Sequence, residues 1–323
     1  MALKTKTGLD PIHSPVGLLV IDKPRGMSSH TVVQNVRRLY GLRKVGHAGT
    51  LDPEATGVMV VALGSATRLL EYYLDQGKTY LADLELGKVS TTGDEEGEIS
   101  TTFTPNKENS WPAQDAIAAV LQTQFTGEIT QIPPAYSALK QGGEPLYKKA
   151  RRGEVFEIPE RTIQIYKADI QHYAPPLLRI EVACSKGTYI RTLAEDIGTA
   201  LETGAYLTAL RRIVSGQFSL QQAHTFEQLE NMTPTERQQA LLPLGYGLQD
   251  MPSVQLSHDQ LIEIQNGRDI SLPADETKTA FTSASTGKQE LLTWSNPQKT
   301  ELVAILEQRE NGLWKPRKVF VGA

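Results

Sequence analysis

Residues 46–57 read GHAGTLDPEATG, and the apolar run VMVVAL follows directly at 58–63. Glycine accepts positive φ and lets another part of the chain approach closely, so the three glycines of this stretch predict a tightly turned loop. The loop carries one short carboxylate, Asp52, which Pro53 follows. The apolar run predicts a buried strand over 57–63. We therefore expect a constrained loop that holds a single acid, with His47 nearby, ahead of that strand.

The same residues allow a plainer interpretation, which is the start of a helix. Asp52 would be the N-cap, Pro53 the first helical residue and Glu54 an acid of the first turn, all preferred residue types at these positions. Local chemistry alone favours this alternative, and it gives Asp52 no role beyond capping.

Periodic patterns on either side of the loop predict a mixed fold. Strands are expected at 16–22, 57–63, 80–86 and 177–184, and helices beginning at Ser28 or Ser29, over 114–125 and over 189–201. The polar segments 90–98 and 101–113 are expected to be turn and loop. Because strands and helices alternate without a strict βαβ rhythm, we expect an α/β (α+β) fold with a mixed, largely antiparallel sheet and flanking helices.

Two regions depart from this pattern. Residues 131–154 form an insertion that fits neither repeat and contains a basic group, Lys148, Lys149, Arg151 and Arg152. After a proline-punctuated stretch at 233–252, a short helix at 258–265 is expected before strands near Leu291, Leu302 and Val319. We therefore expect a larger domain at 1–248 and a small β-rich domain at 249–323, with the Ser/Thr-rich stretch 277–287 as a surface loop.

Charge and composition limit the function classes. The formal net charge of −4 argues against a protein that coats nucleic acid indiscriminately. Basic residues are nevertheless clustered at 37–44, 148–152, 211–212 and 315–318. Solvated faces explain most such runs, but four of them in an acidic chain favour nucleic-acid binding on selected surfaces.

The chain carries no sign of export or membrane insertion. Its single cysteine, Cys184, excludes an internal disulfide, fits a reducing compartment and is expected to be buried in its apolar run. No apolar stretch approaches the roughly 20 residues of a membrane span. Residues 1–14 lack the apolar core of a secretory signal, so we expect a cytoplasmic location and no membrane partner.

Metal and nucleotide motifs are missing from the sequence. The histidines are far apart, there is no H-E-x-x-H motif and no cysteine pair, and neither a P-loop nor a G-x-G-x-x-G before a helix occurs. A poised acid without a cofactor motif suits a redox-neutral reaction, so we expect no metal and no cofactor.

Five segments between about residues 16 and 215 resemble, in order, motifs of the TruB family of pseudouridine synthases, which modify the T loop of tRNA. They are 21–29, 46–57, 78–80, 185–193 and 210–212. The match of 46–57 to the family's catalytic motif is highly specific and favours a catalytic loop over the start of a helix. By this resemblance Asp52 is the catalytic nucleophile or base, and Arg191 pairs with it.

The resemblance also implies residues that bind the substrate or support the loop. Tyr80 would stack on the target uracil, Tyr189 and Leu210 would line the base pocket, and His47 would fill space left by extruded nucleotides. The supporting residues would be Lys23, Pro24, Gly49 and Gly57. The insertion at 131–154 resembles the family's thumb loop, and its basic residues Lys148, Lys149, Arg151 and Arg152 would meet RNA phosphates.

Two of these residues have a physical alternative. Tyr80 shares its strand face with apolar residues through Leu86 and could be a core residue, whereas a ring at the rim of that face could stack on a flipped base, worth about 1–3 kcal/mol. Arg191 could form an exposed ion pair with Glu195, worth about 0–1 kcal/mol. Facing Asp52, it would instead keep that carboxylate ionised.

The resemblance implies isomerisation of uridine 55 in the T arm of tRNA to pseudouridine, by a monomer that needs no protein partner. Residues 249–323 resemble a PUA RNA-binding domain. Three alternatives remain: a guide-dependent synthase acting on ribosomal RNA, which the thumb-like insertion disfavours; a non-catalytic RNA-binding or tRNA-folding protein, which has no need of Asp52; and a glycosidase. The last would require two carboxylates around one bond, and Glu54 is the nearby candidate for the second.

Overall fold

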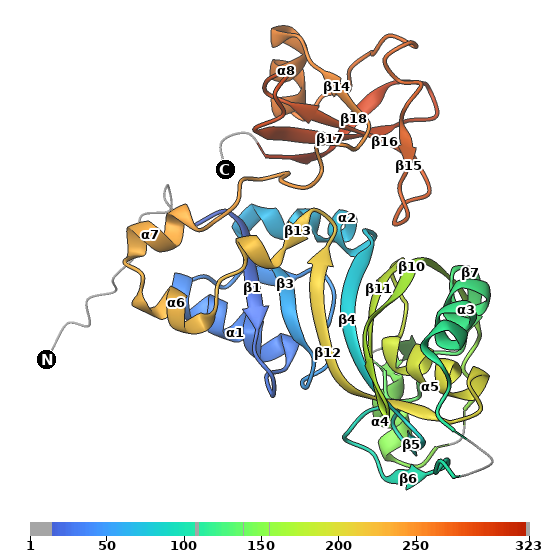
Figure 1. Cartoon of the computed structure of the whole chain (residues 1–323). Helices are drawn as coiled ribbons and strands as arrows, with labels where there is room; N and C mark the ends of the chain where they lie inside the picture. The colour runs from blue at the N-terminus through green and yellow to red at the C-terminus, as the bar shows by residue number, and fades with distance from the viewer. Residues whose placement is uncertain (1–14, 107–109, 138, 155, 321–323) are drawn as a thin grey trace, which may run out of the picture.

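The computed structural model describes residues 15–106, 110–137, 139–154 and 156–320, so the expectation for residues 1–14 lies outside it (Figure 1). The strands of the main sheet are β1 (Gly17–Lys23), β2 (Val45–His47), β3 (Thr56–Leu63), β4 (Lys78–Leu86), β7 (Gly127–Gln131), β10 (Arg161–Ala174), β11 (Leu177–Cys184), β12 (Ala205–Ser215) and β13 (Phe218–Ser219). Their order is β1-β3-β12-β4-β11-β10-β7, with β2 beside β3 and β13 beside β12. Only β12 and β3 pair in parallel among these described strands. The predicted fold class is therefore confirmed.

Helices flank this sheet (Figure 1). They are α1 (Ser29–Tyr40), α2 (Leu70–Leu74), α3 (Gln114–Gln124), α5 (Ile190–Ala200), α6 (Phe226–Asn231) and α7 (Pro234–Gln239), with 3-10 turns η2 (Gly64–Leu69) and η3 (Leu220–Gln222). Ser28 is the N-cap of α1, since its hydroxyl accepts from the Thr31 N–H at 3.1 Å. The predicted cap therefore belongs to Ser28 and leaves Ser29 free for another contact.

Strand β3 is buried on both faces, which explains its unbroken apolar run. Met59, Val61 and Leu63 pack in one core with residues of α1 and α6. Val58 and Val60, which point the opposite way, pack in a second core with residues of η2 and α2. The loop that carries Asp52 therefore enters the sheet at a strand held from both sides.

Strand β4 shows the predicted alternation instead. Tyr80, Ala82, Leu84 and Leu86 are buried, and the residues between them are half-buried. These four pack with the apolar stripe of α5, which includes Ile190, Leu193 and Ile197. The start of α5 and the start of β4 thus lie on one core, beside the loop.

A second sheet follows the main one in sequence. It consists of β14 (Ser253–Gln255), β15 (Phe281–Thr282), β16 (Gln289–Trp294), β17 (Leu302–Gln308) and β18 (Trp314–Val319), and α8 (His258–Gln265) accompanies it. The expected helix and the three expected strands are present. The Ser/Thr-rich stretch 277–287 is not simply a surface loop, because it contains β15 and because Ser283 is buried.

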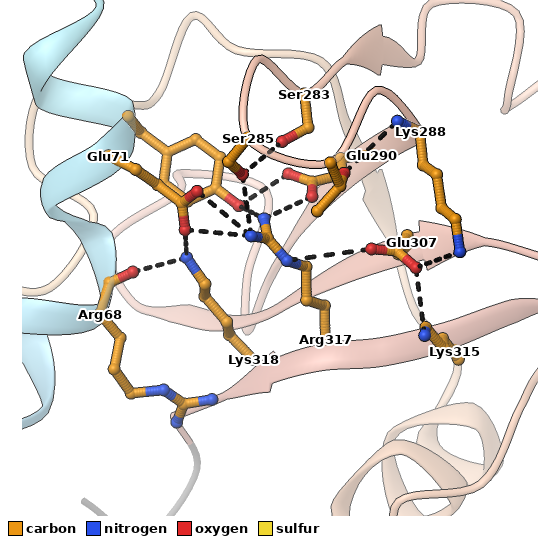
Figure 2. Close-up of polar contacts among 12 residues, drawn as sticks. Arg68, Glu71, Ser283, Ser285, Lys288, Glu290, Glu307, Lys315, Arg317 and Lys318 are labelled. Carbon is orange, nitrogen blue, oxygen red and sulfur yellow. Dashed lines mark hydrogen bonds and ion pairs between the residues drawn. The ribbon is translucent and has the colours of Figure 1, made fainter. Parts of the chain in front are cut away.

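A cluster of polar side chains joins the second sheet to α2 (Figure 2). We call it the junction cluster, and its members are Glu71, Tyr72, Glu290, Arg317 and Lys318. Glu290 is fully buried, accepts from the Tyr72 hydroxyl at 2.7 Å and pairs with Arg317. Arg317 and Lys318 both pair with Glu71, which lies in the first turn of α2. Every ion in this buried junction therefore has a partner.

Several elements were not predicted. They are β7, β10, β12, α6 and α7, together with the hairpin β5 (Lys88–Ser90) and β6 (Ile99–Thr101) at the edges of the expected turn. Gln131, expected to open the insertion, instead ends β7 and is buried. The insertion itself contains a short hairpin, β8 (Lys140–Gln141) and β9 (Glu144–Pro145), and helix α4 (Leu146–Arg151). Within the described ranges, no helix has both the length and the apolar character required to cross a bilayer.

Candidate active site

The segment around Asp52 is an irregular turn rather than a helix, so the interpretation as a helix start is wrong. The Ala55 N–H donates to the Asp52 carbonyl oxygen at 3.2 Å and closes the turn. Gly49 and Gly57 have φ of +103° and +100°. A Cβ atom at Gly57 would lie 2.2 Å from the carbonyl oxygen of Arg212. Both the dihedral angle and the close approach therefore require glycine at position 57.

Two side chains, Lys23 at the end of β1 and Ser29 at the start of α1, fix the backbone of this turn by hydrogen bonds. The buried Lys23 ammonium donates at 3.0, 2.7 and 2.8 Å to three carbonyl oxygens, those of Pro24, Met27 and Pro53. Burial lowers the pKa of Lys23 to about 8. The Ser29 hydroxyl donates to the Leu51 carbonyl at 2.8 Å and accepts from the Leu51 N–H at 2.9 Å. The residues on both sides of Asp52 are thus fixed by hydrogen bonds.

Arg191, in the first turn of α5, joins two carboxylates. Its Nη2 lies 3.1 Å from Asp52 Oδ2, and its Nη1 lies 3.3 Å from Asp94 Oδ2. The Arg191 side chain is 8% exposed and that of Asp52 is 48% exposed. The protein therefore holds the guanidinium in place while the carboxylate reaches the surface. Among the described residues Arg191 forms no ion pair with Glu195 within 4 Å, so the exposed-bridge alternative is wrong.

A cavity of about 330 Å³ opens beside the Asp52–Arg191 pair. Its lining includes three residues expected at a base pocket, Tyr80, Tyr189 and Leu210. Tyr80 is 9% exposed, so it belongs to the core and also presents part of its ring to the cavity. Burial raises the pKa of Tyr80, which keeps its hydroxyl neutral. The cavity thus places two aromatic side chains next to one carboxyl group.

Tyr189 is held by a residue from the far edge of the sheet. The Gln131 side chain donates to the Tyr189 carbonyl at 3.0 Å and accepts from the Tyr189 N–H at 2.8 Å. The Arg161 guanidinium lies over the Tyr189 ring, 5.7 Å from its centroid. This end of α5 is therefore anchored on both sides, and the ring is oriented.

A second cavity, of about 270 Å³, lies on the other side of the ion pair, and Asp52, Arg191 and Leu210 line both cavities. Glu54 borders this second cavity and pairs with Arg25 at 2.6 Å. The acid that shares a partner with Asp52 is Asp94 rather than Glu54. Two carboxylates on one guanidinium are not the free pair that a glycosidase needs.

Other predicted residues lie outside these cavities. His47, on β2, is half-buried and lines neither of them, and burial lowers its pKa, so the ring is neutral. Lys148 is exposed, and Lys149 donates to Gln141 at 3.2 Å. Arg152 already has two carboxylate partners, Glu144 and Glu154, at 2.7 and 2.6 Å. The side chain of Arg151 lies outside the described part of the structure. Two other residues of the insertion, Ser137 and Leu139, do line the larger cavity.

Three residues of the site were missed by sequence reasoning. They are Asp94, Gln131 and Arg212. Asp94 lies in the segment 90–98, which is expected only to be a turn, and no local pattern links it to Arg191. Arg212 was grouped with Arg211 as surface charge, but it is 1% exposed. Since neighbours on a strand face opposite ways, an Arg-Arg pair on a central strand would have predicted one buried arginine.

No group of three or more His, Cys, Asp or Glu side chains in the described ranges is arranged to hold a metal ion. The buried cations Lys23, Arg191 and Arg212 dominate the charge around Asp52 instead.

Comparison with known proteins gives the family. Residues 37–190 match the model of the TruB family pseudouridylate synthase N-terminal domain, and residues 191–249 match the tRNA pseudouridylate synthase B C-terminal domain. The chain is 47% identical over 238 residues to tRNA pseudouridine synthase B of Syntrophotalea carbinolica, which covers 74% of this chain and 76% of that protein. The chain belongs to the TruB family. The two family models end at residue 249, before the second sheet begins.

Other TruB relatives and solved structures extend the likeness to the second sheet. The tRNA pseudouridine synthase B of Arthrobacter sp. strain FB24 is 41% identical over 94% of this chain and 96% of its own length. The fold is similar to a chain of a Cbf5–Nop10–Gar1 complex, with a TM-score of 0.70 and 26% identity over 97% of this chain and 88% of that chain. An archaeal box H/ACA sRNP Nop10–Cbf5 complex contains a similar chain, with a TM-score of 0.66 and 26% identity over 96% of this chain and 88% of that chain.

Proposed function

We propose that this TruB-family chain converts a uridine of tRNA, at position 55 in the T arm, to pseudouridine. The relatives named tRNA pseudouridine synthase B support both the substrate and the reaction. The observation that carries the proposal is the Asp52–Arg191 pair, 3.1 Å apart, at the wall of a cavity lined by Tyr80, Tyr189 and Leu210.

The reaction is an isomerisation and needs no external reactant. The N1–C1′ bond of the target nucleotide breaks, the uracil turns within the cavity, and its C5 bonds to C1′. The proton of C5 is lost and N1 gains one, so atoms and electrons balance. Asp52 supplies the catalytic carboxylate, by adding to the sugar, by adding to the base or by removing a sugar proton. Arg191 pairs with this carboxylate and orients it.

The cavity suits a base that has left its stack. Extruding a nucleotide from a folded loop costs a few kcal/mol. Stacking on an aromatic ring such as Tyr80 returns about 1–3 kcal/mol. Tyr189 and Leu210, which also line the cavity, would limit it to a flat ring while leaving that ring room to turn. His47, which lies on the edge strand that leads into the loop, would occupy space left by the extruded nucleotides.

Parts of the molecule away from the cavity would bind the rest of the RNA. Lys148, which is exposed, and Lys149, which is half-buried, would meet backbone phosphates together with Arg151 and Arg152. The second sheet, at 253–319, would form a PUA-like RNA-binding domain of residues 249–323. We propose that the chain works as a cytoplasmic monomer, without cofactor or protein partner.

Tritium release from C5-labelled uridine in an unmodified tRNA transcript tests the proposal directly. The wild-type chain should release one equivalent without guide RNA or added cofactor. Asp52→Asn should bind tRNA normally and stay below about a hundredth of the wild-type rate, a loss of about 2.7 kcal/mol. Glu54→Gln, two residues away, is the matched control and should remain active. A faster Asp52→Asn variant would remove Asp52 from the chemistry, and wild-type binding without release would favour an RNA-folding role.

The likeness to chains of Cbf5 complexes favours a second candidate, a synthase that acts with a guide RNA and protein partners. The same assay separates the two. Release that appears only after a guide RNA and partner proteins are added would replace the proposal by this candidate.

A further inference from the structure

Arg212, on the central strand β12, is a buried cation that has no acidic partner among the described residues. Its side chain is 1% exposed, and no carboxylate of the described residues lies within 4 Å of its guanidinium nitrogens. Its Nε donates to the Val58 carbonyl at 2.7 Å, and its Nη2 donates to the Gly49 carbonyl at 3.2 Å. A buried charge is costly unless it is paired or fully hydrogen-bonded, so the presence of an arginine at position 212 requires an explanation.

The two carbonyl groups that it binds define its position. Gly49 is where the chain enters the turn that carries Asp52, and Val58 is where the chain enters the body of β3. One guanidinium therefore bridges the two ends of the Asp52 loop. The backbone of Arg212 closes the same loop, since it pairs in register with Gly57, where a side chain would clash with its carbonyl oxygen.

The same side chain also reaches the base cavity. Arg212 lines it together with Asp52 and Tyr80, and its charge opposes the effect of burial on the pKa of Tyr80. A guanidinium is a planar fork whose donors diverge, so it can span two carbonyl groups that point from different strands. A lysine ammonium has its donors on a single atom, so it can replace the guanidinium only if that atom lies within hydrogen-bond distance of both carbonyl groups.

We propose that Arg212 is a positioning residue for the reaction: by holding Gly49 and Val58 together it keeps the Asp52 carboxylate against Arg191 and in line with the ring of Tyr80. Lys23 and Ser29 fix the middle of the loop, whereas Arg212 fixes its ends. The inference rests on the proposed function. Since a displacement of about 1 Å at a reacting group can cost about a hundredfold in rate, the effect should fall on the chemical step and not on RNA binding.

The test compares Arg212→Lys and Arg212→Ala with a control, Arg237→Met. Arg237 also donates to a backbone carbonyl, that of Leu39 at 3.1 Å, but it lies on α7 and contacts no residue of the Asp52 loop. Tritium release from labelled tRNA is measured in single turnover at saturating enzyme, the tRNA dissociation constant is measured in parallel, and folding is checked by circular dichroism. We expect the rate of the alanine variant to fall by about a hundredfold and that of the lysine variant by about tenfold, with dissociation constants within about threefold of wild type.

Chemical rescue distinguishes positioning from general loss of structure. Ethylguanidinium matches the atoms that Arg212→Ala removes, so it should raise the rate of that variant and leave that of Arg237→Met unchanged. A folded lysine variant with the wild-type rate would overturn the inference, as would losses confined to tRNA affinity. An unfolded lysine variant would also overturn it, since Arg212 would then serve folding alone. A wild-type chain that releases no tritium would instead refute the proposed function.

Discussion

Replacing Arg191 by lysine should slow the reaction even though it preserves the charge. The guanidinium contacts four groups: Asp52 Oδ2 at 3.1 Å, Asp94 Oδ2 at 3.3 Å, the Thr92 carbonyl at 3.3 Å and the Tyr136 carbonyl at 2.9 Å. These groups lie around the edge of one planar fork. A lysine ammonium is a compact and strongly hydrated point charge, and it cannot serve both carboxylates and both carbonyls at once.

The magnitude follows from the interaction with Asp52. A hydrogen bond to a charged group contributes about 1.5–3 kcal/mol net. The Asp52 side chain is 48% exposed, so water partly replaces the missing guanidinium and the lower part of that range applies. A loss of about 1.5–2 kcal/mol corresponds to a rate reduced about 10- to 30-fold.

The assay is single-turnover tritium release at saturating enzyme, so that changes in tRNA affinity do not enter. Arg179→Lys is the matched control, because Arg179 forms a bidentate pair with Asp83 but does not touch Asp52. Thermal unfolding of both variants reports any loss of folded protein. A folded Arg191→Lys chain that reacts as fast as Arg179→Lys would refute the reasoning, since the fork geometry would then be dispensable.

Changing Lys148 and Lys149 to glutamine should weaken tRNA binding and flatten the plot of log affinity against log salt by about 0.7–0.9 for each lysine–phosphate ion pair removed. Arg152→Gln, which removes a guanidinium already paired with two carboxylates, should alter the slope less. Equal slopes for wild type, the double lysine variant and Arg152→Gln would contradict the assignment of the two lysines to RNA phosphates. Burial raises the pKa of Cys184 to about 11, so a thiol reagent at pH 8 should label it only in denaturant; rapid labelling of the folded chain would show that the residue is accessible. Burial lowers the pKa of Lys23 from 10.5 to about 8, so between these values the unfolded chain holds a proton that the folded chain lacks, and this lysine makes stability rise with pH. In urea titrations, the free energy of unfolding of wild type relative to that of Lys23→Met should increase with pH between these two values, by no more than about 3 kcal/mol. A difference between the two chains that does not change with pH would contradict the lowered pKa of Lys23.

Sequence patterns predicted those elements whose signal is local. Three burial patterns could be predicted from short stretches of sequence, and all three are confirmed. They are the apolar run of β3, the alternation of β4 and the apolar stripe of α5. Strand β12 was missed because its residues alternate less regularly. Two adjacent arginines interrupt the pattern, and one of them, Arg212, is buried and donates to the Gly49 carbonyl, a contact that no local pattern predicts.

In the site, too, the features that depend on contacts distant in sequence were not predicted. The turn at Asp52 carries good helix-start chemistry, but Ser29 and Lys23 bind the backbone on either side of it in a non-helical conformation. Those hydrogen bonds join residues more than twenty positions apart, so they cannot be predicted from local propensity. Likewise the contact of Asp94 with Arg191 depends on how a hairpin folds over α5, which no spacing in the chain reveals.

The junction cluster has a consequence for the order in which a new chain matures. Its bonds from Arg317 and Lys318 to α2 join residues 245–247 positions apart. At about 5–20 residues per second, synthesis needs roughly 12 to 50 seconds between these segments. During that interval α2 lies without its ionic partners, and the apolar face that later receives Trp294 and Ile305 stays uncovered. Chaperones and proteases therefore meet this face before it closes. A weakened junction would show itself first as a lower yield of finished chains, long before it slowed the reaction of those that had closed.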